Sequence, residues 1–499
     1  MKAHIVGGGF GGLAAAACLI LNAGVPGSDI VIYEASEKPG GGFFLGGDPT
    51  SGYNLPGSVF DDKFFCAFSL LAQIPTLSDP SQSVKDQFFA FNQANPFNDR
   101  GHIVDGSGAV VGHTAGFGLT PDDLLSFLKL LITAEAELDD KRIDEFFSKS
   151  FFSTEFFLLY STIMGSLPQH SAMEFSRYIN RTALLLPSLY NMQAILRTPR
   201  DQYETFIEPM AAWLERQGVK IAFQAYVTDL RFAASPDPLT VVALDYLRAE
   251  VAYEVPVADG DIVLVSLGSQ IEGMLVGSKA AAPTGLSKRP SSVALWRKLA
   301  AAHPGLGDPD AFFDPSRVGD TRWVMFTVTT SSTVFQDLLA ALTTSPSGTG
   351  GIVTLKDSPW LISLTVFHQP EVVDQSDDIW VWWGYGLHPE QNGATFGKPM
   401  NQCTGAEILE EVVRELKFDA DLQAILASSN CVPCDLPYVN NIWLPCKLAD
   451  RPDVAPRHAT NLGLVGQYAE TPQDIGFTME YSARTAWEAV YRLLGRGPP

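Results

Sequence analysis

Three glycines close to the start of the chain have the spacing of a dinucleotide-binding turn. Gly7, Gly9 and Gly12 complete the pattern GxGxxG. Glycines at these positions allow a tight turn, the approach of a pyrophosphate to backbone N–H groups, and close packing of a helix on a sheet. Glu34 follows Gly12 by 22 positions, where a carboxylate can accept hydrogen bonds from an adenosine ribose. These four residues predict a bound dinucleotide, either FAD or NAD.

The elements that must position these residues are visible in the flanking sequence. Residues 3–6 predict a short buried strand, residues 13–21 a helix, and residues 30–34 (IVIYE) a second strand that ends in the acid. The order strand, glycine turn, helix, strand, acid is the context that the GxGxxG pattern requires. It distinguishes a nucleotide site from an ordinary glycine-rich turn.

Two distant segments predict further parts of the same domain. Residues 261–269 (DIVLVSLGS) predict a strand that reaches Gly268 and rejoins the sheet. The last segment predicts a strand, a loop and a helix over residues 477–494. The N-terminus of that helix, at Phe477, carries a partial positive charge and would point towards the cofactor or its phosphates. Assembly of one domain from three separate segments favours a flavoprotein, and therefore FAD.

The intervening chain predicts a substrate-binding part of mixed structure. Phe-rich apolar stretches predict helices, some lining an apolar channel; they are FFCAFSLLAQIP, DLLSFLKLLI, EFFSKSFFSTEFFLLYSTIMG and TALLLPSLYNMQAIL. The alternating stretches RWVMFTVTT, GGIVTLKDSPWLISLTVFH and DIWVWWGYGL predict antiparallel strands with one buried face. The stretches TTSPSGTGG and LSKRPSS predict surface loops.

The predicted fold class is α/β, with a Rossmann-type FAD-binding domain assembled from discontinuous segments and a mixed helical and antiparallel-sheet substrate domain. A chain of 499 residues exceeds what one hydrophobic core usually serves. The expected segments are 1–60, 217–295 and 456–499 for the FAD-binding domain, 61–216 for the mainly helical part of the substrate domain, and 296–455 for its antiparallel sheet.

The composition of the chain excludes several partners. A formal net charge of -22 would repel nucleic-acid phosphates and anionic membrane surfaces, and no basic run compensates for it. The apolar stretch at residues 13–21 is shorter than the roughly 20 residues needed to cross a bilayer. We therefore expect no nucleic-acid partner and no transmembrane segment.

Six cysteines in so long a chain predict buried free thiols in a reducing cytoplasm rather than a disulfide framework. Cys431 and Cys434 form a CxxC pair, but no second pair stands at zinc-site spacing, and we expect no metal. Pro433 and Pro437 predict that this pair lies in a turn rather than on a redox helix.

Several stretches, all in the same order, resemble the oleate hydratase family, also called myosin-cross-reactive antigens. Members of that family bind FAD and add water to a cis double bond of unsaturated fatty acids without net redox change. The similarity runs from Ile5 to Leu494. The stretches that carry it are IVGGGFGGLAAAACLI, EKPGG, FFSTEFF, QHSAMEFSRYINR, DQYETFIEPMAAWLERQGV, GGIVTLKDSPW, WGYGLHPEQNGATFGKPMNQCTGAEILEE, LPYVNN and GQYAETPQDIGFTMEYSARTAWEAVY.

The resemblance implies further cofactor contacts. It places Gly41 and Gly42 around FAD with the glycine turn and Glu34, together with the segment GQYAETPQDIGFT before the last helix. In that segment Phe477 and Thr478 are candidate cofactor contacts, and Glu470 is a further candidate that can approach the flavin. Asp474 has two alternative roles, approach to the flavin or capping of the helix that begins near Phe477.

The resemblance also implies one catalytic residue and the loss of another. In the family, a tyrosine within a segment like SAMEFSRYINR is taken to protonate the alkene, and this residue is Tyr178 here. The water-activating glutamate belongs to an RGGRE loop, but this chain has GYNLPGSVFDDKFFC there, with Val59 or Phe60 at the glutamate position. Neither side chain accepts a proton. Asp61 is the candidate replacement, and solvation or helix capping is the alternative role for such an acid.

Three more polar residues are candidate substrate contacts. Arg200 and Asp201 replace the tyrosine and asparagine that are usual in the family before QYE. Arg200 and Gln202, which follows it by two positions, are therefore expected at the substrate end of the pocket. His170 precedes the Tyr178 segment and can relay a proton, with a structural role at the helix start as the alternative.

The sequence leaves more than one activity open. The first is hydration of an unsaturated fatty acid or similar apolar acid, with Tyr178 giving the proton and the flavin stabilising developing positive charge. If no base activates water, loss of a neighbouring proton moves the double bond, so an isomerase is the alternative. A flavin oxidoreductase is disfavoured because there is no second GxGxxG. A non-catalytic binding protein is disfavoured by the retained tyrosine segment. A homodimer is possible, but typical members carry a C-terminal extension linked to dimer contacts that this sequence lacks, so the oligomeric state is not carried over.

Overall fold

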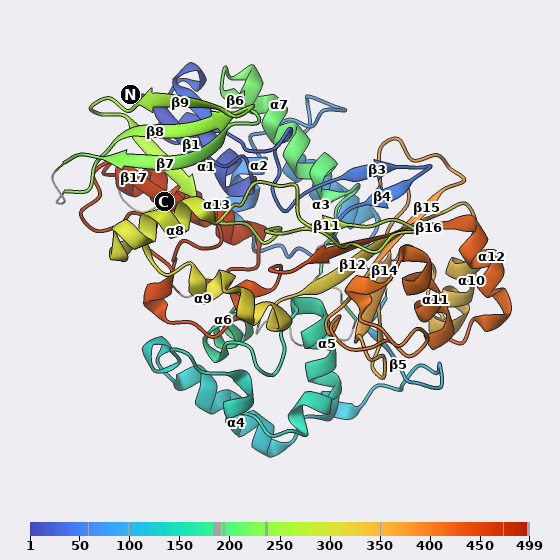
Figure 1. Cartoon of the computed structure of the whole chain (residues 1–499). Helices are drawn as coiled ribbons and strands as arrows, with labels where there is room; N and C mark the ends of the chain where they lie inside the picture. The colour runs from blue at the N-terminus through green and yellow to red at the C-terminus, as the bar shows by residue number, and fades with distance from the viewer. Residues whose placement is uncertain are drawn as a thin grey trace.

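The computed structural model describes residues 1–57, 59–97, 99–182, 191–192, 195–234, 238–349, 351–472 and 474–496. Two sheets organise the molecule (Figure 1). A five-stranded parallel sheet lies near both chain ends, and a seven-stranded sheet lies on the opposite side.

The parallel sheet joins three segments that are far apart in the sequence. Its strand order is β17 (Leu462–Val465), β10 (Ile262–Ser266), β1 (Ala3–Val6), β2 (Ile30–Tyr33) and β6 (Lys220–Ala222). Every neighbouring pair is parallel, and β1 and β17 are buried along their whole length, as expected for a sheet covered on both faces. The prediction of a Rossmann-type domain assembled from discontinuous segments is confirmed.

Helices and a small sheet pack around this core. Helix α1 (Phe10–Leu21) contacts α13 (Met479–Leu493) and α7 (Glu208–Arg216), and α13 contacts α2 (Phe65–Leu71). Helix α1 begins before the predicted residue 13, directly after the glycine turn, whereas α13 begins after Thr478, which is its N-cap. A three-stranded antiparallel sheet contains β7 (Tyr226–Phe232), β8 (Val241–Arg248) and β9 (Val251–Pro256).

The seven-stranded sheet contains the strands predicted between residues 296 and 455. Its order is β11 (Leu275–Val276), β16 (Ser429–Leu436), β12 (Trp323–Thr330), β15 (Trp380–Gly386), β14 (Ile362–Val366), β13 (Ile352–Leu355) and β5 (His102–Val104). The pairing of β13 with β5 is parallel, and the other pairings are antiparallel. A two-stranded hairpin of β3 (Gly46–Asp48) and β4 (Gly52–Asn54) packs against β12 and β16.

Both faces of the seven-stranded sheet are covered, so the prediction of one buried face is wrong. All eight residues of β12 are buried. On one face Phe326 and Trp382 pack in a core with helices α10 (Val334–Thr343), α11 (Gly405–Glu415) and α12 (Leu422–Ser428). On the other face Trp323 and Trp383 pack with residues of the nucleotide domain. The sheet is therefore the middle layer of the molecule.

The CxxC pair lies within strand β16, so the prediction that it forms a turn is wrong. Cys431, Pro433 and Cys434 pair with β12 along a continuous antiparallel register. The carbonyl oxygen of Pro433 accepts a hydrogen bond of 2.8 Å from the N–H of Gly277. All six cysteines are free and buried, as predicted.

Three of the four Phe-rich stretches contain α-helices, as predicted. Besides α2 they contain α5 (Glu155–Met164) and most of α4 (Pro121–Ile132). Helices α3 (Val84–Ala94), α8 (Ala294–Ala302) and α9 (Asp310–Phe313) lie outside them, and α6 (Ala172–Thr182) ends at the first residue of the fourth stretch. The stretch TALLLPSLYNMQAIL falls mostly outside the described residues. Rings such as Phe127, Phe151 and Phe175 pack on one another and form core.

Within the described ranges, no helix combines the length and the apolar composition that crossing a bilayer requires. In the same part of the chain, no group of three or more His, Cys, Asp or Glu side chains is arranged to hold a metal ion. The boundaries of the five segments expected from the sequence stay a prediction.

Replacing Gly12 by Ala is expected to destabilise the fold. A β-carbon at Gly12 would lie 1.9 Å from the carbonyl oxygen of Gly7, so α1 would have to move away from β1. Overpacking of this kind costs about 1–3 kcal/mol or more, which urea unfolding would measure. Gly112→Ala is the matched control, because its β-carbon would meet no atom within 4 Å. Equal stability of the two variants would contradict this account.

Candidate functional site

A cavity of about 350 Å³ opens at the carboxyl ends of the parallel strands. In sheets of this kind, ligands bind outside those ends. The residues that line it there come from all three segments of the nucleotide domain: Val6, Gly7, Tyr33, Glu34, Ser266, Gly268 and Gly466. The cavity is therefore where the predicted cofactor residues meet.

Glycine backbone forms one wall of the cavity. Gly7, Gly9, Gly41 and Gly42 all line it. Gly7 has φ +98°, a conformation that favours glycine, and a β-carbon on Gly41 would lie 3.3 Å from the α-carbon of Gly9. Gly12 does not line the cavity; it allows α1 to pack on the carbonyl of Gly7. Four of the predicted glycines therefore line the ligand cavity, whereas Gly12 allows the helix to pack closely on the strand.

The carboxylate of Glu34 lies at the end of β2 and faces the glycine turn. It accepts hydrogen bonds from the backbone N–H of Gly8 (2.6 Å) and of Ser36 (2.8 Å), and from the Ser36 hydroxyl. These contacts fix the side chain beside the turn, on the cavity wall. This is the placement that the strand, turn and acid pattern predicts.

Aromatic and apolar side chains also line the cavity. They come from the inner face of the seven-stranded sheet and from the nucleotide domain. The members are Phe43, Phe44, Ile271, Trp323, Met325, Trp383, Leu436 and Phe477. The cavity therefore combines a lining of glycine backbone, which suits a polar cofactor, with an apolar lining, which suits an apolar substrate.

The turn before α13 closes the cavity. Phe477 and Thr478 line it, and the Thr478 hydroxyl caps the helix by accepting a hydrogen bond of 3.1 Å from the N–H of Tyr481. Asp474 does not cap α13, which rules out one of its two expected roles; its carboxylate pairs with Arg484. Gly268, with φ +69°, lines the cavity after β10.

Tyr178 lies on α6 behind this turn. Its hydroxyl accepts a hydrogen bond of 2.7 Å from the N–H of Phe477, and its ring packs 4.4 Å from Trp443. Tyr178 is fully buried, and this burial raises the pKa of its phenol well above the usual value. Tyr178 is not among the cavity-lining residues, but Phe477 contacts both the phenol and the cavity. The phenol is therefore protonated at neutral pH, and Phe477 lies between it and the cavity.

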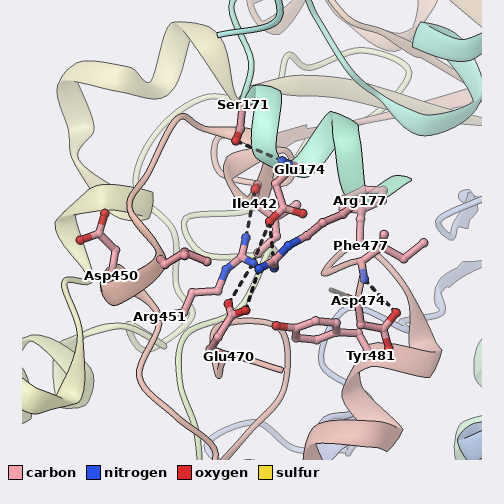
Figure 2. A network of polar contacts seen from close by, with 12 residues as sticks. Ser171, Glu174, Arg177, Ile442, Asp450, Arg451, Glu470, Asp474, Phe477 and Tyr481 are labelled. Carbon is pink, nitrogen blue, oxygen red and sulfur yellow. Dashed lines mark hydrogen bonds and ion pairs between the residues drawn. The ribbon is translucent and has the colours of Figure 1, made fainter. Parts of the chain in front are cut away.

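Glu470 lies away from the cavity wall, in a buried network of charges behind it (Figure 2). Its carboxylate lies 2.8 Å from Arg177 and 3.6 Å from Arg451. The side chain therefore contacts two guanidinium groups on the phenol side of the turn. Its predicted contact with the flavin stays untested.

Asp61 lies at the end of the loop that lacks the family's glutamate. Its Oδ1 accepts a hydrogen bond of 2.6 Å from the N–H of Lys63, and burial raises the pKa of its carboxyl. It does not line the cavity, whereas Pro56 and Gly57 of the same loop do. The structure thus does not bring Asp61 together with the cofactor residues, and its catalytic role remains a prediction.

His170 makes two backbone contacts in the interior. Its Nδ1 accepts a hydrogen bond of 2.9 Å from the N–H of Leu167, and its Nε2 lies 2.8 Å from the carbonyl oxygen of Asp320. Burial lowers the pKa of His170 to about 4. These contacts support the structural role, because both ring nitrogens are engaged away from the cavity.

Gln202 lines the cavity and donates a hydrogen bond of 2.9 Å to the carbonyl oxygen of Pro56. Arg200 points away from it and donates a hydrogen bond of 2.7 Å to the carbonyl oxygen of Pro370. Of the two predicted substrate contacts in this segment, the structure brings only Gln202 to the site.

Sequence reasoning missed a group of buried acids beside Gln202. Burial and the Glu204 carboxyl raise the pKa of Asp201 to about 8. The pKa of Glu371 is also raised well above its usual value by burial and by Asp201, whose N–H donates to the Glu371 carbonyl oxygen. Asp201 was visible as a departure from the family pattern, but Glu371 comes from a distant segment that carried no signal.

Arg289 was missed because its segment, LSKRPSS, predicts a surface loop. Leu286 in this loop is 92% exposed, but residues 289–292 line the cavity. Glu272 holds the loop there by accepting two hydrogen bonds of 2.6 Å from the N–H and hydroxyl of Ser292. Arg289 is the one cation among the described residues that line the cavity.

Comparison with solved structures defines the class of fold. The structure resembles a putrescine oxidase solved with putrescine bound, with a TM-score of 0.57, 12% identity, and coverage of 99% of each chain. It resembles cyclohexylamine oxidase from Brevibacterium oxydans IH-35A with a TM-score of 0.54, 13% identity, and coverage of 99% of this chain and 98% of that one. At identities of 12–13%, this likeness concerns the fold alone.

The chain belongs to the MCRA family, whose model matches residues 1–491. It is 30% identical over 512 residues to an oleate hydratase of Streptococcus pyogenes serotype M49 (strain NZ131), covering 100% of this chain and 86% of that protein. It is 27% identical over 536 residues to a linoleate hydratase of Lactiplantibacillus plantarum, covering 99% of this chain and 94% of that protein. The family resemblance found in the sequence is confirmed.

The buried, neutral His170 predicts a pH dependence of stability. Because its pKa falls to about 4 on folding, the unfolded chain binds more protons between that pH and the ordinary histidine pKa of about 6.5. The contribution of His170 to the free energy of unfolding is therefore present above about pH 6.5 and is lost as the pH is lowered towards 4. We expect urea unfolding to show a loss of about 2 kcal/mol from this residue between about pH 7 and pH 5. His170→Asn should show a flatter profile, and an unchanged slope would refute the assignment.

Proposed function

We propose that this protein hydrates the double bond of an unsaturated fatty acid, with FAD bound in the cavity. The observation that carries the proposal is its full-length similarity to two hydratases, one named for oleate and one for linoleate. The apolar cavity wall formed by side chains such as Trp323 and Trp383 suits a long hydrocarbon chain. Hydration therefore agrees with both the relatives and the chemistry of the site.

The cavity fits FAD by the donor groups and space that it offers. The glycine backbone at Gly7 and Gly9, next to the N-terminus of α1, suits a pyrophosphate, and the Glu34 carboxylate suits a ribose. Arg289 supplies a full positive charge that would favour a diphosphate in this acidic chain. When bound, FAD would supply electrostatic stabilisation of the positive charge that develops on the alkene.

The chemistry assigned to the protein is proton transfer at Tyr178. Hydration places a proton on one alkene carbon and a hydroxyl on the other. The buried phenol of Tyr178 keeps its proton at neutral pH, as a proton donor must. Water forms the new C–O bond and loses a proton, which restores the phenol directly or through a carboxylate. Asp61 is the residue predicted for that relay.

The alternatives raised by the sequence are less well supported. Both relatives are named as hydratases, which favours hydration over double-bond migration. The amine oxidases share only the fold at 12–13% identity and give no support to a redox reaction. A cytoplasmic location and a homodimer stay predictions.

Product mass tests the proposed activity. Incubation of the FAD-loaded protein with oleic or linoleic acid is expected to give a hydroxy acid that is heavier by one water, detected by mass spectrometry. Tyr178→Phe should lower kcat at least about a hundredfold, since it removes the proton donor, while the flavin absorbance of the holoprotein persists. A product of unchanged mass with shifted retention would indicate an isomerase, and loss of hydrogen would indicate redox chemistry. Undiminished activity of Tyr178→Phe would remove Tyr178 from the mechanism.

Arg289 is predicted to contribute to FAD affinity independently of turnover. Arg289→Ala should weaken FAD binding about tenfold, because one charge-assisted contact with a diphosphate is lost. Quenching of flavin fluorescence measures the Kd, and the difference should shrink at high salt. Lys288→Ala is the matched control, because Lys288 belongs to the same loop but does not line the cavity. If both variants bind FAD like the parent protein, Arg289 does not contact the cofactor.

A further inference from the structure

Two arginines and three glutamates form a charged network in the interior, and Figure 2 shows Glu174, Arg177, Arg451 and Glu470 of it. Arg177 and Arg451 have side chains that are only 1% exposed, and Glu174 is completely buried. Arg451 Nη1 lies 2.8 Å from Glu174, and Arg177 Nη2 lies 2.8 Å from Glu470. The two guanidinium groups meet between the carboxylates of Glu174 and Glu470.

The outer side of the network is less buried. Glu135 forms two parallel hydrogen bonds, of 2.8 and 2.9 Å, with Arg177, and its side chain is 28% exposed. It does not pair with Arg451. Glu135 therefore belongs to the same network, but it is more exposed than Glu174 and Glu470 and is not among the charges that act on the phenol, so it serves as the control position.

The network links the helix that carries the phenol to the turn that closes the cavity. Glu174, Arg177 and Tyr178 all lie on α6. Glu470 belongs to the segment between β17 and α13, which also contains Phe477 and other cavity-lining residues. The hydrogen bond from the Phe477 N–H to the Tyr178 hydroxyl joins the same two elements. The ion pairs and this hydrogen bond therefore fix the position of α6 relative to the turn before α13.

We propose that Glu174 and Glu470, held by Arg451 and Arg177, are positioning residues that set the phenol of Tyr178 against the cavity wall. This inference rests on the proposed function, because it assigns the network a purpose in proton donation. Neither glutamate lines the cavity, so both act through Tyr178. Glu470 thus takes a role in the site that is different from the flavin contact predicted for it.

The charges that face the phenol support this role. From its own helix Glu174 faces Tyr178, from α5 Tyr160 does, and from the loop before β17 Arg451 does. Burial is the main cause that raises the pKa of the phenol, and the Glu174 carboxylate adds to it, whereas Arg451 and the Phe477 N–H oppose it. Removing the negative charge of Glu174 would therefore make the phenol easier to ionise.

The experiment compares Glu174→Gln and Glu470→Gln with the matched control Glu135→Gln in the FAD-loaded protein. We expect kcat for fatty acid hydration to fall about tenfold to a hundredfold in the first two variants, as for small misplacements of a reacting group. KM and flavin content should change little. Glu135→Gln should keep near-parental kcat. Glu174→Asp, which retains the charge, should recover part of the lost rate.

A pH profile separates positioning from general stability. In Glu174→Gln the alkaline limb of kcat should move to lower pH, because the pKa of Tyr178 falls, and in Glu135→Gln it should not move. If the parent protein hydrates its substrate but Glu174→Gln and Glu470→Gln keep its kcat and pH profile, the proposal is wrong. If both variants fail to fold, the network is only structural and the proposal is also wrong. If the parent protein gives no hydroxy acid, the proposed function fails first, and the two failures are distinguishable.

Discussion

The site depends on how closely α1 approaches the end of β1. Gly12 lies where a β-carbon would be 1.9 Å from the Gly7 carbonyl, so the helix begins directly over the strand. This contact brings the N-terminus of α1 and Gly9 to the cavity. It also sets the position of α13, which packs along α1 and carries Thr478 at its N-cap. The contact between Gly7 and Gly12 therefore helps to position two parts of the cavity wall, at Gly9 and at Thr478.

The second requirement is a covered antiparallel sheet. Neighbouring side chains of a strand face opposite sides of the sheet, so Trp383 faces the cavity while Trp382 faces the other side. Helices from the same part of the chain bury Trp382 there. The sheet thus supplies a rigid apolar wall, while the nucleotide domain supplies backbone N–H groups and Glu34. The phenol comes from neither sheet but from α6, which has to be held by contacts of its own.

The sequence predicted what depends on local order and missed what depends on packing. The strand, glycine turn, helix and acid around Glu34 lie within about 30 residues, a span that one βαβ unit covers, and the pattern is specific. The second covered face of the sheet was not visible, because the residues that cover it, such as Phe44 and Ile271, come from distant segments. Pro433 signals a turn locally, yet tertiary pairing with β12 keeps it in a strand. Arg289 lies in a loop with surface composition, and only the bond between Glu272 and Ser292 shows that the loop folds back onto the cavity.

The same distinction explains why the charged network has no sequence signature. Replacing a buried ion pair by apolar residues of similar volume is often neutral or stabilising, so pairing alone does not account for two buried arginines. What charges provide is a single geometry, because Arg177 and Arg451 each have to satisfy glutamates from α6 and from the turn before α13. Ion pairs add directional contacts between the helix and the turn that apolar packing does not provide. For a proton donor that lies one residue behind the cavity wall, a small displacement of the helix is large enough to affect the rate.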